Sequence, residues 1–258
     1  MLLAIALSAV AEDWREELTP PLEPGPVPPP RPLTATYRFG WGAISAADAS
    51  IDFSRQNSGS ELQLKLTART SGAVRALWRL DAEHIARCVA ATLRPISFQQ
   101  TEKYRHETEK TTAEFTGDEI YRVQETTPPP KVPTKPKRFD FPNLTDLNTA
   151  LLLVRSQALD EGDRYSLVVY PSRTAYFARI DVLGRETIKV GSRQYDAVKT
   201  QISLQHITKE MELEPHSKFK NAYAWLSDDK DRLLLKVVTE VFVGNVWMEL
   251  QSVKVAPP

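Results

Sequence analysis

The chain has 258 residues with 33 basic and 33 acidic side chains, so its formal charge is zero and offers no general electrostatic attraction to nucleic acid or an anionic membrane. Hydrophobic residues make up 41% of the sequence, which is enough for a core, and the length suits one large β-domain. The single cysteine, Cys88, excludes an intrachain disulfide, a CxxC redox pair and a cysteine-rich zinc site. It lies in a strand-like segment, so we expect a small buried apolar residue.

Residues 1–11 are predicted to be a signal peptide. A short apolar run is followed by Ala9-Val10-Ala11, which has the small-x-small form of a signal-peptidase site, and then by acidic residues. The basic n-region is missing, and the alternative is the apolar tail of a cytosolic protein. The run is too short to span a bilayer, and no later segment is long and apolar enough. We therefore expect a periplasmic protein without a transmembrane anchor.

Residues 12–32 are predicted to form a disordered, proline-rich arm. Proline stands at positions 20, 21, 24, 26, 28, 29, 30 and 32. This density disfavours helix and sheet and favours an extended polyproline II segment, with a reach of roughly 43 Å. We interpret the arm as a spacer, and a recognition motif for proline-binding domains is the alternative.

The region 33–258 is predicted to be a single β-domain. Apolar residues alternate with polar ones in many short segments, and turn residues separate these segments. The pattern gives about a dozen strands, and their short connections favour an antiparallel meander. Residues 74–80 fit neither a strand nor a helix pattern clearly. A basic, proline-rich linker at 126–142 is interpreted as a solvated connection, with contact to acidic lipid head groups as the alternative.

The stretch 143–159 is the only long helical pattern in the chain. Leu144, Leu147, Leu151 and Val154 recur at spacings of three and four, and further apolar residues widen this stripe. A helix so apolar around its circumference needs cover on more than one side. The predicted fold is therefore mainly β, a strongly curved antiparallel sheet (an open or incomplete barrel) wrapped around one central α-helix.

The ends of this helix carry suitable polar residues. Asn143 or Thr145 is the predicted N-cap, and Asp146 places negative charge in the first turn. Arg155 lies near the C-terminus, where a cation suits the helix dipole, and we expect an acidic or carbonyl partner to hold it. Leu147, Leu151 and Val154 are expected to be buried against the concave face of the sheet.

The sequence contains no motif for enzyme chemistry. The four histidines, at 84, 106, 206 and 216, show no metal spacing, and no nucleophile elbow or glycine-rich phosphate loop occurs. Asp228 and Asp229 are adjacent carboxylates, but in a strand they would point to opposite faces. We therefore predict a protein that is not an enzyme, with no catalytic residue, cofactor or metal.

The segment around Asp228 is predicted to be a structural hairpin. We expect Asp228 to accept backbone hydrogen bonds in the turn and Trp225 to pack inward. The alternative is that Trp225 and other aromatic residues line a surface that binds sugar or lipid.

Several motifs, in a fixed order, resemble a family known as domain of unknown function 3108, found in exported proteins of Gram-negative bacteria. They are Tyr37-x-x-Gly40-Trp41-Gly42, Leu93-Arg94-Pro95, Asp146-Leu147-Asn148-x-Ala150-Leu151-x-x-x-Arg155, Leu159-x-x-Gly162-Asp163 and Trp225-Leu226-Ser227-Asp228-Asp229-x-x-Arg232. The resemblance covers about residues 34–255, and Leu234 departs from the proline expected after the last motif. It implies an envelope location and an open barrel similar to periplasmic lipoprotein carriers, and it implies no catalytic residues.

Two hypotheses of different classes remain open. In the first, a non-enzymatic periplasmic protein holds a hydrophobic or lipid-like ligand, or another envelope component, in the concave face of the sheet. In the second, the helix permanently fills that face, and the protein is a scaffold or interaction module. An envelope hydrolase is a distant third, because no nucleophile and base can be paired from the sequence.

Overall fold

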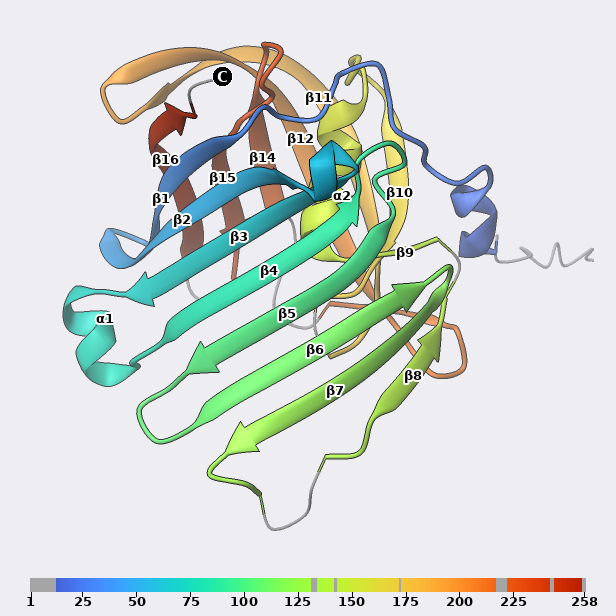
Figure 1. The fold of residues 1–258 in the computed structure, drawn as a ribbon. Helices are drawn as coiled ribbons and strands as arrows, with labels where there is room; N and C mark the ends of the chain where they lie inside the picture. Colours follow the sequence, from blue (N-terminus) through green and yellow to red (C-terminus); the bar gives the residue numbers. More distant parts are fainter. Residues whose placement is uncertain are drawn as a thin grey trace, which may run out of the picture.

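One β-sheet of sixteen strands dominates the structure, a computed structural model that describes residues 13–130, 134–141, 143–171, 173–216, 222–241 and 244–256 (Figure 1). The strands are β1 (Leu33–Trp41), β2 (Ile44–Gln56), β3 (Glu61–Thr70), β4 (Asp81–Val89), β5 (Pro95–Lys103), β6 (Thr108–Thr116), β7 (Glu119–Thr127), β8 (Lys137–Asp140), β9 (Leu144–Thr145), β10 (Arg164–Val169), β11 (Tyr176–Val190), β12 (Arg193–Ile207), β13 (Leu213–Pro215), β14 (Ala222–Ser227), β15 (Leu234–Glu240) and β16 (Asn245–Val255). The helices are α1 (Gly72–Leu77) and α2 (Leu147–Ser156), and the 3-10 helices are η1 (Trp14–Leu18) and η2 (Asn57–Gly59). The predicted β class is confirmed, with more strands than the expected dozen.

The sheet curls into a nearly closed barrel. Its strand order is β8-β7-β6-β5-β4-β3-β2-β1-β16-β15-β14-β12-β11-β10-β9, with β13 paired to β12. All neighbouring pairs are antiparallel except β9 and β10. The antiparallel pairing of β1 with β16 joins the start of the domain to its end, so the first and last strands lie at the middle of the sheet.

Apolar packing closes the barrel where backbone pairing stops at the edge strands β8 and β9. Phe98 and Ile120, from β5 and β7, share a buried cluster with Val168 and Phe177, from β10 and β11. A second, larger cluster fills the rest of the interior and includes side chains of α2. The two halves of the sheet are therefore held together by hydrophobic burial.

Close backbone packing explains one glycine of the Tyr37-x-x-Gly40-Trp41-Gly42 motif. A Cβ atom at Gly40 would lie 2.1 Å from the ring of Trp247, the residue opposite it on β16. The Trp247 indole also donates a hydrogen bond to the Gly42 carbonyl at 2.8 Å. Glycine at position 40 thus allows the indole to lie across β1.

Helix α2 is shorter than the predicted range 143–159. Residues 144–145 pair with β10 as the parallel strand β9, which keeps the chain extended until Asp146. The N-cap is therefore Asp146, and neither Asn143 nor Thr145 takes this role. The prediction of a central helix applies to α2 alone, because a second helix, α1, forms where the sequence pattern was indistinct.

The proline-rich arm packs against the domain, so the prediction of a disordered segment is wrong for residues 13–32. Leu18 is buried, and the Trp14 indole donates to the Met211 carbonyl at 3.0 Å. The amides of Gly25 and Val27 donate to the side chain and carbonyl of Ser156, both at 2.9 Å. The last turn of α2 leaves carbonyl groups without a partner inside the helix, and the arm supplies a donor to the carbonyl of Ser156.

The linker predicted at 126–142 also contains regular structure. Residues 137–140 form β8, which pairs with β7, and Phe141 is buried beyond it. This basic segment is therefore partly an edge strand. The predicted signal peptide, residues 1–11, lies outside the described residues. Among the described residues, no helix is long and apolar enough to cross a membrane.

Candidate functional site

The N-terminus of α2 is held by a buried carboxylate. Asp146 is 1% exposed, and its Oδ1 accepts hydrogen bonds from the amides of Asn148 at 2.8 Å and Thr149 at 3.2 Å. The Thr149 hydroxyl donates to Oδ2. Burial is the largest influence and raises the pKa of Asp146, while these hydrogen bonds oppose it. Asp146 is thus engaged in capping and has no substrate-facing oxygen to act as a base.

The C-terminus of α2 is held by a buried arginine, as predicted. Arg155 is 4% exposed and donates to the carbonyls of Pro28 at 3.1 Å and Asp231 at 2.9 Å. Both partners are carbonyls, one from the arm and one from the β14–β15 hairpin. Desolvation lowers the pKa of Arg155 to about 10, so the side chain stays charged at neutral pH. The arginine joins three segments that are far apart in the sequence.

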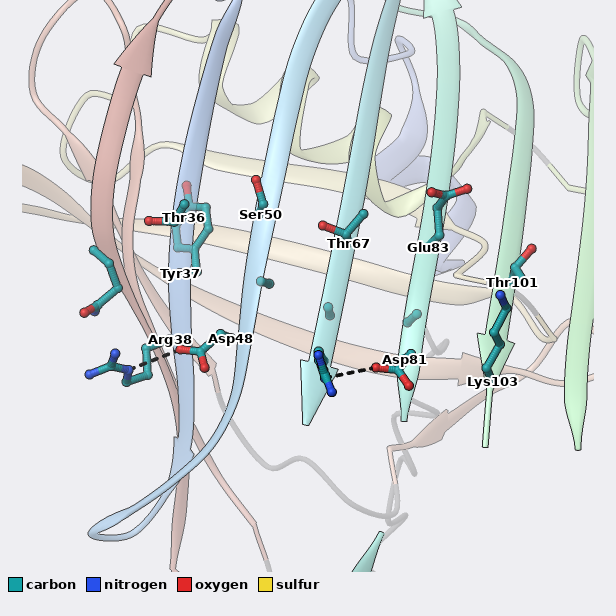
Figure 2. Close-up of a pocket in the computed structure, with 15 residues that line it drawn as sticks. Thr36, Tyr37, Arg38, Asp48, Ser50, Thr67, Asp81, Glu83, Thr101 and Lys103 are labelled. Atoms are coloured by element: carbon teal, nitrogen blue, oxygen red, sulfur yellow. Dashed lines mark hydrogen bonds and ion pairs between the residues drawn. The ribbon is translucent and has the colours of Figure 1, made fainter. Parts of the chain in front are cut away.

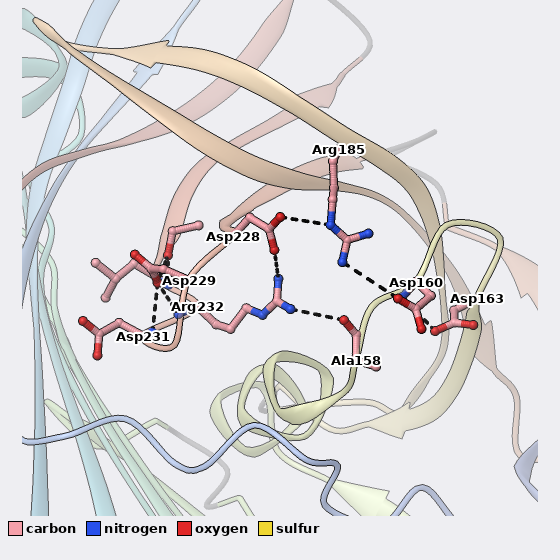
Figure 3. A network of polar contacts seen from close by, with 10 residues as sticks. Ala158, Asp160, Asp163, Arg185, Asp228, Asp229, Asp231 and Arg232 are labelled. Carbon is pink, nitrogen blue, oxygen red and sulfur yellow. Dashed lines mark hydrogen bonds and ion pairs between the residues drawn. The ribbon is translucent and has the colours of Figure 1, made fainter.

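A second arginine ties the β14–β15 hairpin to the chain that follows α2 (Figure 3). Arg232 donates to Asp228 at 2.9 Å and to the Ala158 carbonyl at 3.2 Å. Arg185 donates to the other oxygen of Asp228 at 2.9 Å. The prediction that Asp228 accepts backbone hydrogen bonds in the turn is wrong, because its oxygens face two guanidinium groups. Asp229 takes that role, because its side chain accepts hydrogen bonds from the backbone amides of residues 231 and 232.

Trp225 does not pack inward as predicted. Its neighbours Ala224 and Leu226 are buried, and alternation turns Trp225 to the other face of the sheet. There its indole donates to Glu186 at 2.6 Å, and Lys199 Nζ lies 5.4 Å from the ring centroid. The half-buried ring is therefore part of the outer surface.

The buried face of α2 also differs from the prediction. Leu147 is 62% exposed and Leu151 is half-buried, whereas Val154 is buried as expected. Leu152 and Leu153 provide the main apolar contacts with the interior. The helix starts four residues later than predicted, and the spacing alone could not show which side of a broadly apolar helix meets the sheet.

A groove of about 660 Å³ lies on the outer face of the sheet, crossing β16 and β1 to β5. Figure 2 shows its side chains in rows that run across the strands. The buried Ala49 faces the interior, so its neighbours Asp48 and Ser50 face outward. Polar or charged residues supply most of the lining: Thr36, Arg38, Asp48, Ser50, Thr67, Arg69, Asp81, Glu83, Thr101, Lys103 and Gln251.

One row of the groove belongs to a longer ladder of alternating charge. The residues in direct register on seven neighbouring strands are Lys236, Glu249, Arg38, Asp48, Arg69, Asp81 and Lys103. Ion pairs join Arg38 to Asp48 at 3.3 Å and Arg69 to Asp81 at 3.4 Å. The sequence analysis missed this ladder, because the strand register that aligns these residues cannot be seen from alternation within single strands.

A second cavity, of about 280 Å³, lies beneath the arm near the start of α2. Its walls combine polar groups such as Arg94 and Asp118 with leucines from five segments. These leucines are Leu22, Leu93, Leu144, Leu153 and Leu167. Leu93, Arg94 and Pro95, which form one of the motifs described above, supply part of this wall.

Several titratable groups also lie on the inner face of β4 and β5 or beside it. His84 lies 3.6 Å from Glu102, and the Tyr104 hydroxyl donates to Glu102 at 2.6 Å. These contacts, that of His84 first, hold the pKa of Glu102 below its ordinary value, which makes the carboxylate a weak base. Burial raises the pKa of Cys88 to about 12, so its thiol is inert near neutral pH. Within the described ranges, no group of three or more potential ligands could hold a metal ion.

The fold and these contacts define a barrel-like β-sheet protein with a filled interior. The chain belongs to the family of proteins of unknown function DUF3108, whose model matches residues 36–251. No curated protein matches the chain.

One solved structure shares the fold at low sequence identity, and a second matches more weakly. The chain is similar to a crystal structure of a β-barrel-like protein of domain of unknown function DUF1849 from Brucella abortus, with a TM-score of 0.60 and 7% identity, over 88% of this chain and 99% of that one. A protein with a YmcC-like fold from Bacteroides fragilis matches with a TM-score of 0.37 and 8% identity, over 90% and 99% of the two chains.

Proposed function

We propose that this protein is a non-enzymatic interaction module of the periplasm, in which α2 permanently fills the sheet and the outer groove receives a partner. The fixation of α2 carries this proposal. Asp146 caps one end, Arg155 binds two distant carbonyls at the other, and the arm bonds to Ser156. Moving the helix would break all of these contacts together. The proposed location in the periplasm depends on the predicted signal peptide at residues 1–11.

The groove suits a neutral partner that is rich in hydroxyl groups, such as an envelope glycan. Three cations and three anions line it, so its formal charge is zero: Arg38, Arg69, Lys103, Asp48, Asp81 and Glu83. Arg38 pairs with Asp48 and Arg69 with Asp81, and the equal numbers of cations and anions leave little net field to attract an ion. Four hydroxyl side chains and a glutamine amide add donors and acceptors in a row.

The test compares two substitutions on the same face of β3. Thr67→Lys places a long charged side chain in the middle of the groove, and Gln63→Lys makes a similar change outside it. Titration calorimetry with soluble peptidoglycan glycan fragments should show binding that Thr67→Lys weakens at least about tenfold, since it displaces several hydrogen bonds. Gln63→Lys should bind normally. Absence of binding by the unaltered protein, or equal loss in both variants, contradicts the groove assignment.

The cavity beneath the arm favours a second candidate, a holder of a small apolar ligand. Its five leucines would contact an acyl chain, and residues 21–23 of the arm would cover it. Mass spectrometry of an organic extract of protein purified from the periplasm should then detect a bound lipid. Leu153→Trp, which fills the cavity, should remove that lipid. A lipid-free extract from the unaltered protein excludes this candidate.

A further inference from the structure

We propose that the end of the barrel formed by the β1–β2 hairpin and α1 contacts an anionic lipid surface. Four of the eight large hydrophobic side chains exposed on the described chain lie here. Trp41 and Ile44, in the hairpin, are 49% and 53% exposed, and Leu77 and Trp78, at the end of α1, are 88% and 54% exposed. Figure 1 shows α1 at the end of the sheet away from α2.

Backbone pairing places these two segments next to each other. Ala47 on β2 is opposite Thr70 on β3, and the Ser71 amide donates to the Ala46 carbonyl at 2.8 Å. The hairpin before β2 and the helix after β3 therefore lie at the same end of the strands. We call the exposed side chains at this end the apolar rim: Trp41, Ile44, Leu77 and Trp78.

Arginines lie beside the α1 part of the apolar rim, and their charge indicates which partner suits it. Residues 69–81 contain three arginines and one aspartate, a formal charge of +2 in a chain that is neutral overall. Arg69, Arg75 and Arg79 all lie within ion-pair distance of Asp81, at 3.4, 2.9 and 3.7 Å. Arg105 adds a further cation, because its guanidinium donates to the Ala76 carbonyl of α1.

Tryptophan, leucine and arginine together match the interface of an anionic bilayer. Indoles are stable at the level of the lipid head groups, exposed leucine enters the acyl boundary, and arginine binds phosphate. The occupant we commit to is therefore a membrane surface with anionic lipids. The contact would be peripheral, since it involves loop side chains and one helix of six residues.

Vesicle sedimentation with the full chain tests the apolar part of this contact. The protein should bind phosphatidylcholine vesicles that contain phosphatidylglycerol, and more weakly vesicles of phosphatidylcholine alone. The double variant Leu77→Ser with Trp78→Ser should bind the anionic vesicles at least about tenfold more weakly. Leu183→Ser, which removes a leucine 41% exposed on β11, is the matched control and should bind normally.

Charge reversal tests the electrostatic part. Arg79→Glu should weaken binding to anionic vesicles about tenfold, whereas Arg94→Glu, an exposed arginine on the β4–β5 turn at the other end of the strands, should not. Added salt should reduce the difference. The proposal is overturned if the unaltered protein does not sediment with anionic vesicles, or if the variants bind as well as their controls while keeping the parental melting temperature.

Discussion

At the scale of single residues, two buried charged side chains fix α2, and they do so differently. Asp146 accepts hydrogen bonds from the first turn of its own helix, so its contacts are local. Arg155 reaches carbonyls more than 70 residues away along the chain in both directions. The local role follows from helix capping, whereas the distant contacts depend on how the barrel closes.

Replacing Asp146 with asparagine should change how stability depends on pH. Burial raises the pKa of Asp146 in the folded protein above its ordinary value of 3.8, so the folded state favours the protonated carboxyl. The contribution of this protonated group to stability is fully present below pH 3.8 and is lost as the pH rises through the folded pKa. Asp146→Asn retains a capping oxygen and cannot ionise. The free energy of unfolding of Asp146→Asn should therefore increase relative to that of the unaltered protein as the pH rises above about 4.

Urea unfolding at a series of pH values measures this difference. Asp160→Asn, at a side chain that is 75% exposed, controls for the general effect of removing one carboxylate. A difference between Asp146→Asn and the unaltered protein that does not vary with pH contradicts the raised pKa.

Replacing Arg155 with alanine should destabilise the protein by about 2–4 kcal/mol, because two buried carbonyls lose their donor and a cavity remains. Arg31→Ala is the matched control, since Arg31 is half-exposed and pairs with the side chain of the same Asp231 at 2.6 Å. This control should cost at most about 1 kcal/mol. Urea unfolding compares the two variants, and equal losses argue against Arg155 as the connection between helix, arm and hairpin.

At the scale of elements, α2 was predicted from its apolar periodicity, but its orientation was not. The stripe of Leu147, Leu151 and Val154 and the neighbouring Leu152 and Leu153 are similarly apolar. In the structure the helix buries Leu152, Leu153 and Val154 and exposes Leu147. A helix apolar on most sides can be rotated with little change in its own pattern, so the shape of the surrounding sheet selects the buried side.

Alanine substitutions in α2 test this orientation. Leu153→Ala should destabilise the protein by about 2–5 kcal/mol, because the buried side chain leaves a cavity. Leu147→Ala, in the first turn of the same helix, should change stability by less than about 0.5 kcal/mol, because that side chain is exposed. Thermal unfolding is sufficient for the comparison. A larger loss for Leu147→Ala would mean that the helix is rotated from the orientation described.

At the scale of the whole molecule, the charge ladder extends over seven of the sixteen strands and gives the outer face a regular polar surface. Asp48 lies between Arg38 and Arg69 in direct register. Cross-strand charge pairs of opposite sign stabilise a sheet modestly, and like charges destabilise it. The ladder therefore favours one strand register on the side of the sheet that hydrophobic burial does not control.

Reversing one charge in this ladder tests its contribution to the fold. Asp48→Lys would place three cations side by side and should cost about 0.5–1 kcal/mol at low salt, a modest value because these side chains are about half-exposed. Added salt should restore part of the loss. Glu114→Lys, an exposed position on β6 outside the ladder, should show no comparable salt-dependent loss.

The proline-rich arm shows where composition is insufficient to predict structure. Proline density correctly argues against helix and sheet in residues 19–32, but it was also taken to indicate disorder. The segment instead donates backbone hydrogen bonds to Ser156 and accepts one from Arg155. An extended chain without internal hydrogen bonds keeps its polar groups available, so a nearby helix end can order it.

Periodicity was sufficient to predict the β class and a helix near residues 147–156, and the ordered motifs were sufficient to predict the family. The cost of burying an unpaired guanidinium predicted a carbonyl or acidic partner for Arg155. All of this information is local to the chain. The three-dimensional arrangement was needed to establish the rotation of α2, the outward face of Trp225, the docking of the arm and the charge ladder. Each depends on strand register and barrel curvature, which bring together residues whose separation in sequence carries no signal of their contact.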